Sequence, residues 1–114
     1  MVQPEMGNTR KDQLKRLLQA HPGDPFLHHA LGLEWVKSGD DNQARYYFEK
    51  ALDLDPNHVG TYYHLAKLHE RQHRLSDAVA TYKKGLAITH EEDERHMHEE
   101  LQTALQLLQE EMSD

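Results

Sequence analysis

Residues 25–56 read PFLHHALGLEWVKSGDDNQARYYFEKALDLDP, and this stretch decides the fold. A shift of 34 residues brings residues of the same kind together, as with Leu31 and Leu65 or Phe48 and Tyr82. The other matching pairs are Ala44 with Ala78, Leu52 with Leu86, and Leu54 with Ile88. Because one helix pair cannot bury its apolar face alone, a repeat of this length predicts a stacked array of helix pairs.

Small and large residues occupy fixed places in both copies of the repeated stretch. The small ones are Gly32, Ala44, Ala51, Ala66, Ala78 and Gly85, and the large ones are Trp35, Phe48, Tyr62 and Tyr82. Small residues let two helices approach closely, and large ones fill the space beside them. The pattern therefore predicts helices packed in pairs.

This pattern resembles the tetratricopeptide repeat, a helix–turn–helix unit. Residues 25–58 carry it along its full length, at Leu31-Gly32, Trp35, Ala44, Phe48, Ala51 and Pro56. Residues 59–90 carry it at Tyr62, Leu65-Ala66, Ala78, Tyr82 and Gly85, but His69 stands in place of Trp35 and His90 in place of Pro56. The resemblance implies an all-α fold, a right-handed superhelix of helix pairs, and a module that binds proteins without catalysing a reaction.

We expect about six helices in a single domain over residues 9–112, after a flexible tail at residues 1–8. The domain is divided into half a repeat at residues 9–21, repeats at 25–58 and 59–90, and a capping helix at 90–112. The apolar stripe of that last helix leaves an outer face of polar residues, which the end of a repeat array requires.

Capping residues predict where the helices begin and end. Thr9 and Asp24 precede two helices, and Gly39 can take the left-handed conformation that ends the second of them, before a helix over about residues 42–53. Ser76 is predicted to cap the fifth helix. Thr89 and Glu92 are predicted to form a capping box at the start of the sixth.

Composition narrows the classes of function. The chain has 114 residues, a net charge of −7 and no cysteine. No apolar run is long enough to span a membrane, and the first residues do not resemble a signal peptide, so we expect a cytoplasmic protein.

Residues 91–114 hold nine acidic residues against Arg95 alone. The sequence lacks the basic clusters of a nucleic-acid binder and predicts no cofactor.

Residues 69–73 match the H-E-x-x-H pattern of zinc metalloproteases. Two histidines four residues apart on a helix can bind Zn²⁺, while the intervening glutamate activates water. However, His69 takes the place of Trp35 in the first repeat, and His73 takes the place of the turn residue Gly39. With 10 histidines in the chain, such a match arises easily by chance, so we expect neither His69 nor His73 to be a metal ligand.

The resemblance also implies a concave groove, lined by the first helix of each pair, in which a partner peptide binds. By their places in the repeats, the groove residues are Phe26, His29, Leu33, Val36, Tyr63, His64, Lys67, Glu70 and Arg71. The lysine and asparagine clamp of chaperone-binding members is absent. Alternatively, Leu33 and Val36 are covered by residues 9–21, whose Leu14 and Leu18 need an apolar partner. The groove is then apolar at Phe26, Leu33 and Val36 and basic at Lys67 and Arg71, which suits an amphipathic or partly acidic segment. The partner is an unidentified protein or peptide.

Self-association is a second hypothesis. Leu107 lies off the main apolar stripe of the last helix, and Met112 lies near its end. Together with Leu14 and Leu18, these residues could join copies of the chain, although the sequence favours a monomer over an oligomer.

Overall fold

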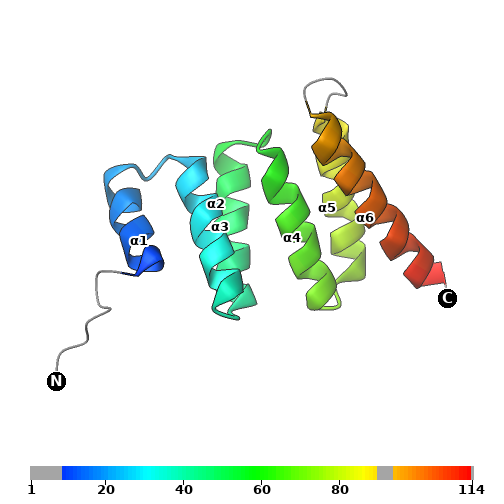
Figure 1. The fold of residues 1–114 in the computed structure, drawn as a ribbon, viewed down its shortest axis with the longest axis horizontal. Helices are drawn as coiled ribbons and strands as arrows, with labels where there is room; N and C mark the ends of the chain where they lie inside the picture. Colours follow the sequence, from blue (N-terminus) through cyan, green and yellow to red (C-terminus); the bar gives the residue numbers. More distant parts are fainter. Residues whose placement is uncertain (1–8, 90–93, 114) are drawn as a thin grey trace. The chain divides into compact units, whose positions relative to one another are not determined.

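A computed structural model describes residues 9–89 and 94–113 of the chain (Figure 1). Within these residues there are six helices and no strand, which confirms the predicted all-α fold. The helices are α1 (Arg10–Ala20), α2 (Pro25–Lys37), α3 (Asp41–Leu54), α4 (Val59–Arg71), α5 (Leu75–Ile88) and α6 (Arg95–Ser113). None of them combines the length and the apolar character that crossing a bilayer requires.

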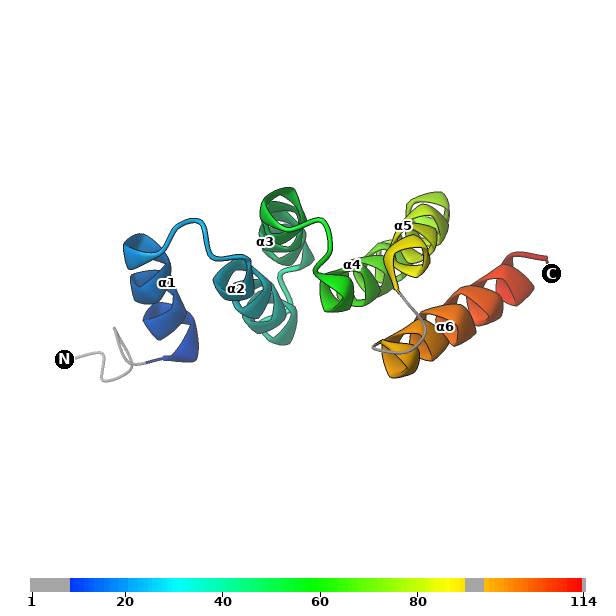
Figure 2. The ribbon, with the colours of Figure 1, turned by 90° about the horizontal axis from the view of Figure 1, so that it is seen from above.

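The chain divides into two compact units, one ending at Pro56 and one beginning at Asn57. In the first, α2 packs against both α1 and α3; in the second, α5 packs against both α4 and α6. The helix pairs α2–α3 and α4–α5 each run antiparallel (Figures 1 and 2). The predicted division of residues 9–112 into repeats with fixed boundaries stays a prediction, and the predicted tail at residues 1–8 lies outside the described residues.

Side-chain caps begin the three helices of the first unit. Thr9 Oγ1 accepts a hydrogen bond from the Asp12 amide at 3.0 Å, and Asp24 Oδ1 accepts one from the Phe26 amide at 2.9 Å. Asp40 Oδ1 accepts one from the Gln43 amide at 3.1 Å. Each cap satisfies a backbone N–H that the first turn leaves without an intrahelical partner. Asp40 therefore begins α3 one residue earlier than predicted.

Two equivalent turns follow α2 and α4. Gly39 (φ 84°) and His73 (φ 60°) both have the left-handed conformation. In the first turn the Asp40 amide donates to Trp35 O at 3.0 Å, and in the second the Arg74 amide donates to His69 O at 2.8 Å. This pattern is the Schellman motif, in which a left-handed residue lets the chain turn back on the helix end.

The predicted starts of α5 and α6 were wrong. α5 begins at Leu75 after Arg74, without a side-chain cap, so Ser76 lies inside its first turn. Thr89 lies at the C-terminal end of α5, where its amide donates to Gly85 O at 3.2 Å and its hydroxyl donates to Leu86 O at 3.1 Å. Glu92, its predicted partner in a capping box, lies outside the described residues, and the described helix begins at Arg95 instead of residue 90.

The core of the first unit lies between α2 and α3, with Leu14 of α1 also buried. Leu31 and Phe48 are fully buried, and the Phe48 ring occupies the space that a Cβ atom on Gly32 would need. Trp35 is covered from α1, whose Lys11 Nζ lies 3.8 Å from the centre of the indole ring. Glycine at position 32 thus lets Phe48 pack directly onto the backbone of α2.

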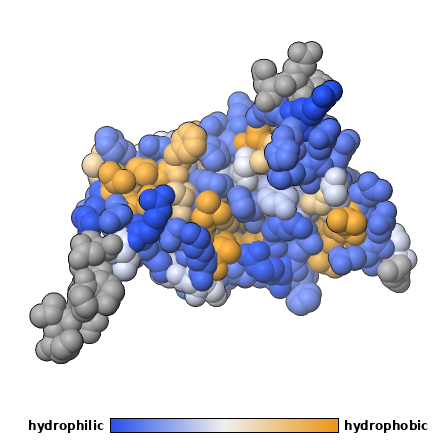
Figure 3. Space-filling model, viewed as in Figure 1, coloured by the Kyte–Doolittle hydropathy of each residue, from blue (hydrophilic) through white to orange (hydrophobic). Residues whose placement is uncertain are grey.

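The core of the second unit includes residues from all three of its helices. Its buried residues are Val59, Ala66, Ala78, Tyr82, Leu101, Ala104 and Leu108. Gly85 lies where a Cβ atom would come within 2.9 Å of Tyr62 Cβ and 3.0 Å of Leu101 Cδ1. On the face shown in Figure 3, most of the surface is hydrophilic, with hydrophobic side chains gathered in separate patches.

Candidate partner-binding surface

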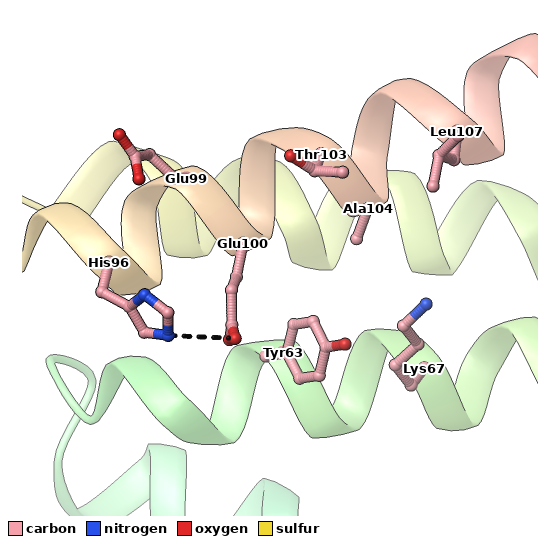
Figure 4. A pocket seen from close by; sticks show the side chains of 8 residues that line it. All are labelled: Tyr63, Lys67, His96, Glu99, Glu100, Thr103, Ala104 and Leu107. Carbon is pink, nitrogen blue, oxygen red and sulfur yellow. Dashed lines mark ion pairs between the residues drawn. The ribbon is translucent and has the colours of Figure 1, made fainter.

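A pocket of about 380 Å³ lies between α4 and α6 in the second unit (Figure 4). We call it the α4–α6 pocket. It is lined by Tyr63 and Lys67 of α4 and by His96, Glu99, Glu100, Thr103, Ala104 and Leu107 of α6. Apolar and charged side chains thus share one concave surface, as they do in most ligand sites.

Helical spacing explains why these residues share the pocket. On α6, Leu101, Ala104 and Leu108 are buried in the core. Glu100, Thr103 and Leu107 follow at intervals of three and four residues along the neighbouring stripe, which borders the pocket. On α4, Tyr63 and Lys67 are four residues apart and therefore present one face. The stripe beside the buried one thus forms the wall of the pocket.

The charges of the pocket are partly paired. His96 Nε2 lies 3.3 Å from Glu100 Oε2, and Lys67 Nζ lies 3.9 Å from Glu70 Oε2. The Lys67 ammonium also lies 5.7 Å from the centre of the Tyr63 ring. Glu100 points toward α4, whereas Glu99 lies at the outer edge (Figure 4). The pocket therefore has carboxylates on its α6 side, and its α4 lysine is close to a carboxylate of its own helix.

His64 adjoins this surface on α4, with its ring packed edge-on to Tyr63 at 5.5 Å between centroids. Burial lowers the pKa of His64, because removing water disfavours the charged imidazolium. Glu100 on α6 raises that pKa and Arg71 on α4 lowers it, both by smaller amounts. Burial decides the direction, so the neutral form of His64 is favoured.

Glu70 joins α4 to α5, because the Tyr82 hydroxyl donates a hydrogen bond to its carboxylate. Burial first, and then this hydrogen bond, raise the pKa of Tyr82. The Glu70 side chain is 23% exposed. The carboxylate that a metalloprotease would use to activate water is thus engaged in packing two helices together.

The two histidines of the H-E-x-x-H match do not share a helix face. His69 is buried within α4, which ends at Arg71. His73 is exposed and lies beyond that end, in the left-handed turn conformation. Two zinc ligands at this spacing need one continuous helix. The described residues, which exclude 90–93, contain no cluster of three or more potential metal ligands.

The nine groove residues predicted from the sequence fall into both units. Four of them lie on α2. Phe26 is 69% exposed, and Leu33 and Val36 are partly buried. The centroid of the His29 ring lies 5.7 Å from that of the Phe48 ring. The other five lie on α4, where Tyr63 and Lys67 line the α4–α6 pocket. His64 and Glu70 contact neighbouring side chains as described above, and Arg71 is exposed.

The contribution of α6 to this surface was not predicted from the sequence. Residues 90–112 are predicted to form a cap with a polar outer face, yet six of the pocket residues belong to α6. The sequence does contain a sign of this second face of α6, because Leu107 lies off the buried stripe and follows Glu100 and Thr103 at helical spacing. That spacing groups the three residues on one face, but it cannot show that the face borders α4.

A protein-family model described as tetratricopeptide repeat matches residues 36–99, more than half of the chain. The chain belongs to the tetratricopeptide repeat family. A tetratricopeptide repeat domain protein from Salinibacter ruber, solved by NMR, is 41% identical to it, with a TM-score of 0.71. That likeness covers 76% of this chain and 88% of the other. Both findings confirm the predicted resemblance, and the family fold is typical of protein-interaction modules.

Two further proteins resemble this tetratricopeptide repeat protein at lower sequence identity. The translocator chaperone SycD of Yersinia enterocolitica matches with a TM-score of 0.85 and 11% sequence identity. The match covers 91% of this chain and 72% of SycD. At this low identity, the likeness shows a shared fold and nothing more. The aspartyl/asparaginyl beta-hydroxylase of Mus musculus is 29% identical over 73 residues, 64% of this chain. The chain spans about a tenth of the length of that enzyme.

Proposed function

We propose that this chain is a protein-interaction module that binds a segment of another protein at the α4–α6 pocket and catalyses no reaction. The observation that carries the proposal is the pocket itself, where apolar and charged side chains of two helices line one concave surface. Protein-binding sites commonly combine a central apolar contact with a polar rim. Leu107, which is 57% exposed, and the half-buried Tyr63 supply the apolar contact.

The proposal also includes the remaining predicted residues. His64, Glu70 and Arg71 border the pocket along α4, and Phe26, His29, Leu33 and Val36 form a second contact surface on α2. The exposed Phe26 is a large apolar side chain available to a partner. A surface built from two helices of the second unit is short, so its affinity for an isolated peptide is modest.

Two observations support the absence of catalysis. The Glu70 carboxylate accepts a hydrogen bond from Tyr82, and His73 lies beyond the end of the helix that holds His69. The matched hydroxylase is an enzyme, but this chain spans about a tenth of it. The sequence likeness therefore gives no reason to assign the hydroxylase activity to this chain.

Selection of random 12-residue peptides on the immobilised chain tests the proposed binding function. A recovered peptide is added to ¹⁵N-labelled protein, and amide shifts are mapped by NMR. We expect the largest shifts at Tyr63, Lys67, Thr103 and Leu107. The exposed residues Lys83 and Lys84 of α5, which do not line the pocket, provide the control surface. Failure to recover a binder, or shifts centred on α5, would contradict the proposal.

Self-association is the second candidate function. It is favoured by the exposure of Leu107 and Met112, both large apolar residues on α6 with 57% and 46% exposure. In that case the surface of α6 would contact another copy of the chain in place of a different protein. The oligomeric state in solution separates the two candidates.

A further inference from the structure

We propose that the α4–α6 pocket selects a partner segment in which an arginine or lysine lies close to an apolar side chain. This inference rests on the proposed binding function and adds the chemistry of the partner. It depends on the arrangement of three features of the pocket: its carboxylates, its apolar wall and the pairing of its lysine.

The carboxylates favour a cation. Glu100 points into the space between the helices, whereas Glu99, which also lines the pocket, points away from α4 (Figure 4). The charge partner of Glu100 on its own helix is His96, 3.3 Å away, which is charged only when protonated. A neutral His96 leaves the negative charge of Glu100 uncompensated within this contact. A guanidinium or ammonium group of a partner is then the complementary ligand.

The wider charge of α6 acts in the same direction. Residues 94–113 contain Glu94, Glu99, Glu100, Glu110 and Glu111 against one basic residue, Arg95. Complementary fields accelerate the encounter of oppositely charged partners and disfavour acidic ones. A basic segment is thus favoured both in its approach and in the pocket.

The lysine of the pocket does not reverse this preference. Lys67 Nζ lies 3.9 Å from Glu70 Oε2, so an acidic partner would have to compete with a carboxylate already in place. Glu70 is itself held by the Tyr82 hydroxyl. From the sequence, Lys67 and Arg71 suggest a basic groove suited to an acidic ligand. The carboxylates of α6 reverse that expectation.

The apolar part of the pocket specifies the second side chain. Ala104 on α6 lies across from Tyr63 on α4, and Leu107, one turn further along α6, lies across from Lys67 (Figure 4). An apolar side chain placed between Tyr63 and Leu107 would cover the exposed part of Leu107. The cation and the apolar group must therefore lie near one another in the partner, because Glu100 and Leu107 are seven residues, or two helical turns, apart.

The peptides selected at random on this chain provide the first test. We expect them to be enriched in arginine or lysine near leucine, methionine or an aromatic residue, relative to the starting library. If peptides are recovered but are enriched in acidic residues, or show no charge preference, this inference is overturned while the proposed function stands. If no peptide is recovered, the proposed function fails, and the inference with it.

Two pairs of matched variants provide the second test, with the Kd of one selected peptide as the readout. Glu100→Gln should weaken binding about two- to fivefold, as expected for one exposed ion pair. Glu110→Gln is the control, because Glu110 has the same charge but lies outside the pocket. Like Glu100, it contacts the side chain four residues before it: Gln106 Nε2 donates to Glu110 Oε2 at 3.3 Å. An equal loss in both variants would indicate non-specific attraction and overturn the inference.

Leu107→Ala should weaken binding by about fivefold or more, whereas Met112→Ala, a change at a similarly exposed residue outside the pocket, should leave it unchanged. Circular dichroism of each variant verifies that the helices are intact. If the free chain self-associates in a way that Leu107→Ala abolishes, the pocket is occupied by a second copy, and the proposal of a different basic partner is overturned.

Discussion

At the scale of single residues, His64 and Glu70 of α4 both contact neighbouring side chains. Glu70 accepts a hydrogen bond from the buried Tyr82 of α5, and His64 lies between the Tyr63 ring and the charges of Glu100 and Arg71. Glu70 therefore links α4 to α5, and both residues contact side chains that line the α4–α6 pocket, His64 through Tyr63 and Glu70 through Lys67. Substitutions here change stability and binding together, which is why the binding tests use the more exposed Glu100 and Leu107.

We predict that the imidazole of His64 titrates below the ordinary pKa of 6.5, because burial lowers its pKa. As the pH falls from 6.5 toward the folded pKa, the unfolded chain takes up a proton that the folded chain does not bind. The contribution of His64 to the free energy of unfolding therefore falls with decreasing pH in this window. NMR titration of the imidazole protons measures the midpoint, and a midpoint at or above 6.5 would contradict the prediction.

Gly85→Ala should lower the free energy of unfolding by about 1–2 kcal/mol, because overpacking outweighs the gain in helix propensity. The added methyl would come within 2.9 Å of Tyr62 Cβ, an atom that cannot move without its backbone. Gly60→Ala in α4 is the control, since no atom lies within 4 Å of the new Cβ, and it should stabilise by up to about 1 kcal/mol. Urea denaturation of both variants measures the difference, and equal effects would refute the packing argument.

At the scale of elements, the two Schellman turns show how one geometry tolerates two residues. Gly39 and His73 occupy equivalent places, and the chain turns back with the same pair of backbone hydrogen bonds after α2 and after α4. Glycine adopts a left-handed conformation readily, whereas a residue with a Cβ atom does so at a cost. The α4–α5 turn therefore stores strain that the α2–α3 turn lacks.

His73→Gly should stabilise the chain by about 0.5–1 kcal/mol, because it removes the cost of a positive φ in a residue with a side chain. The reciprocal variant, Gly39→Ala, should destabilise by about 1 kcal/mol for the same reason. Thermal and urea unfolding of the two variants measure both signs. If His73→Gly were destabilising, the His73 side chain would have to make contacts that outweigh the backbone strain.

At the scale of the whole molecule, the chain consists of two compact units, and the first helix of one and the last helix of the other differ in charge. Helix α1 of the first unit carries four basic residues, Arg10, Lys11, Lys15 and Arg16, against Asp12, while α6 of the second unit is acidic. The exposed apolar residues Leu17, Phe26 and Leu107 lie on three different helices. Apolar residues exposed singly do not form the broad patch of a stable dimer, so we expect at most weak attraction between copies.

We predict that the chain sediments as a monomer of 13.3 kDa at physiological salt. Opposite charges on α1 and α6 should give at most weak association at low salt, because exposed pairs are screened as ionic strength rises. Sedimentation equilibrium over a hundredfold range of concentration measures the mass. A mass that rises with concentration in the wild-type chain, and falls back to that of a monomer in Leu107→Ala, would favour the self-association function instead.

The sequence by itself determined the helices, their pairing and the family, because the period of 34 residues and the alternation of small and large residues are local patterns. Capping by Thr9 and Asp24 depends on side chains within a few residues of the helix start, so both caps were predicted from the sequence. Ser76 was an exception, since the turn through His73 and Arg74 sets the start of α5 instead of a side-chain cap.

Only the tertiary structure decided which stripe of α6 borders α4. Helical spacing groups Glu100, Thr103 and Leu107, but the packing of Leu101 and Leu108 into the core turns that stripe toward Tyr63 and Lys67. The same packing brings carboxylates to a surface that looked basic from α4 alone. The charge of a pocket depends on contacts between residues distant in the sequence, and the repeat pattern encodes the spacing of such residues without fixing their neighbours.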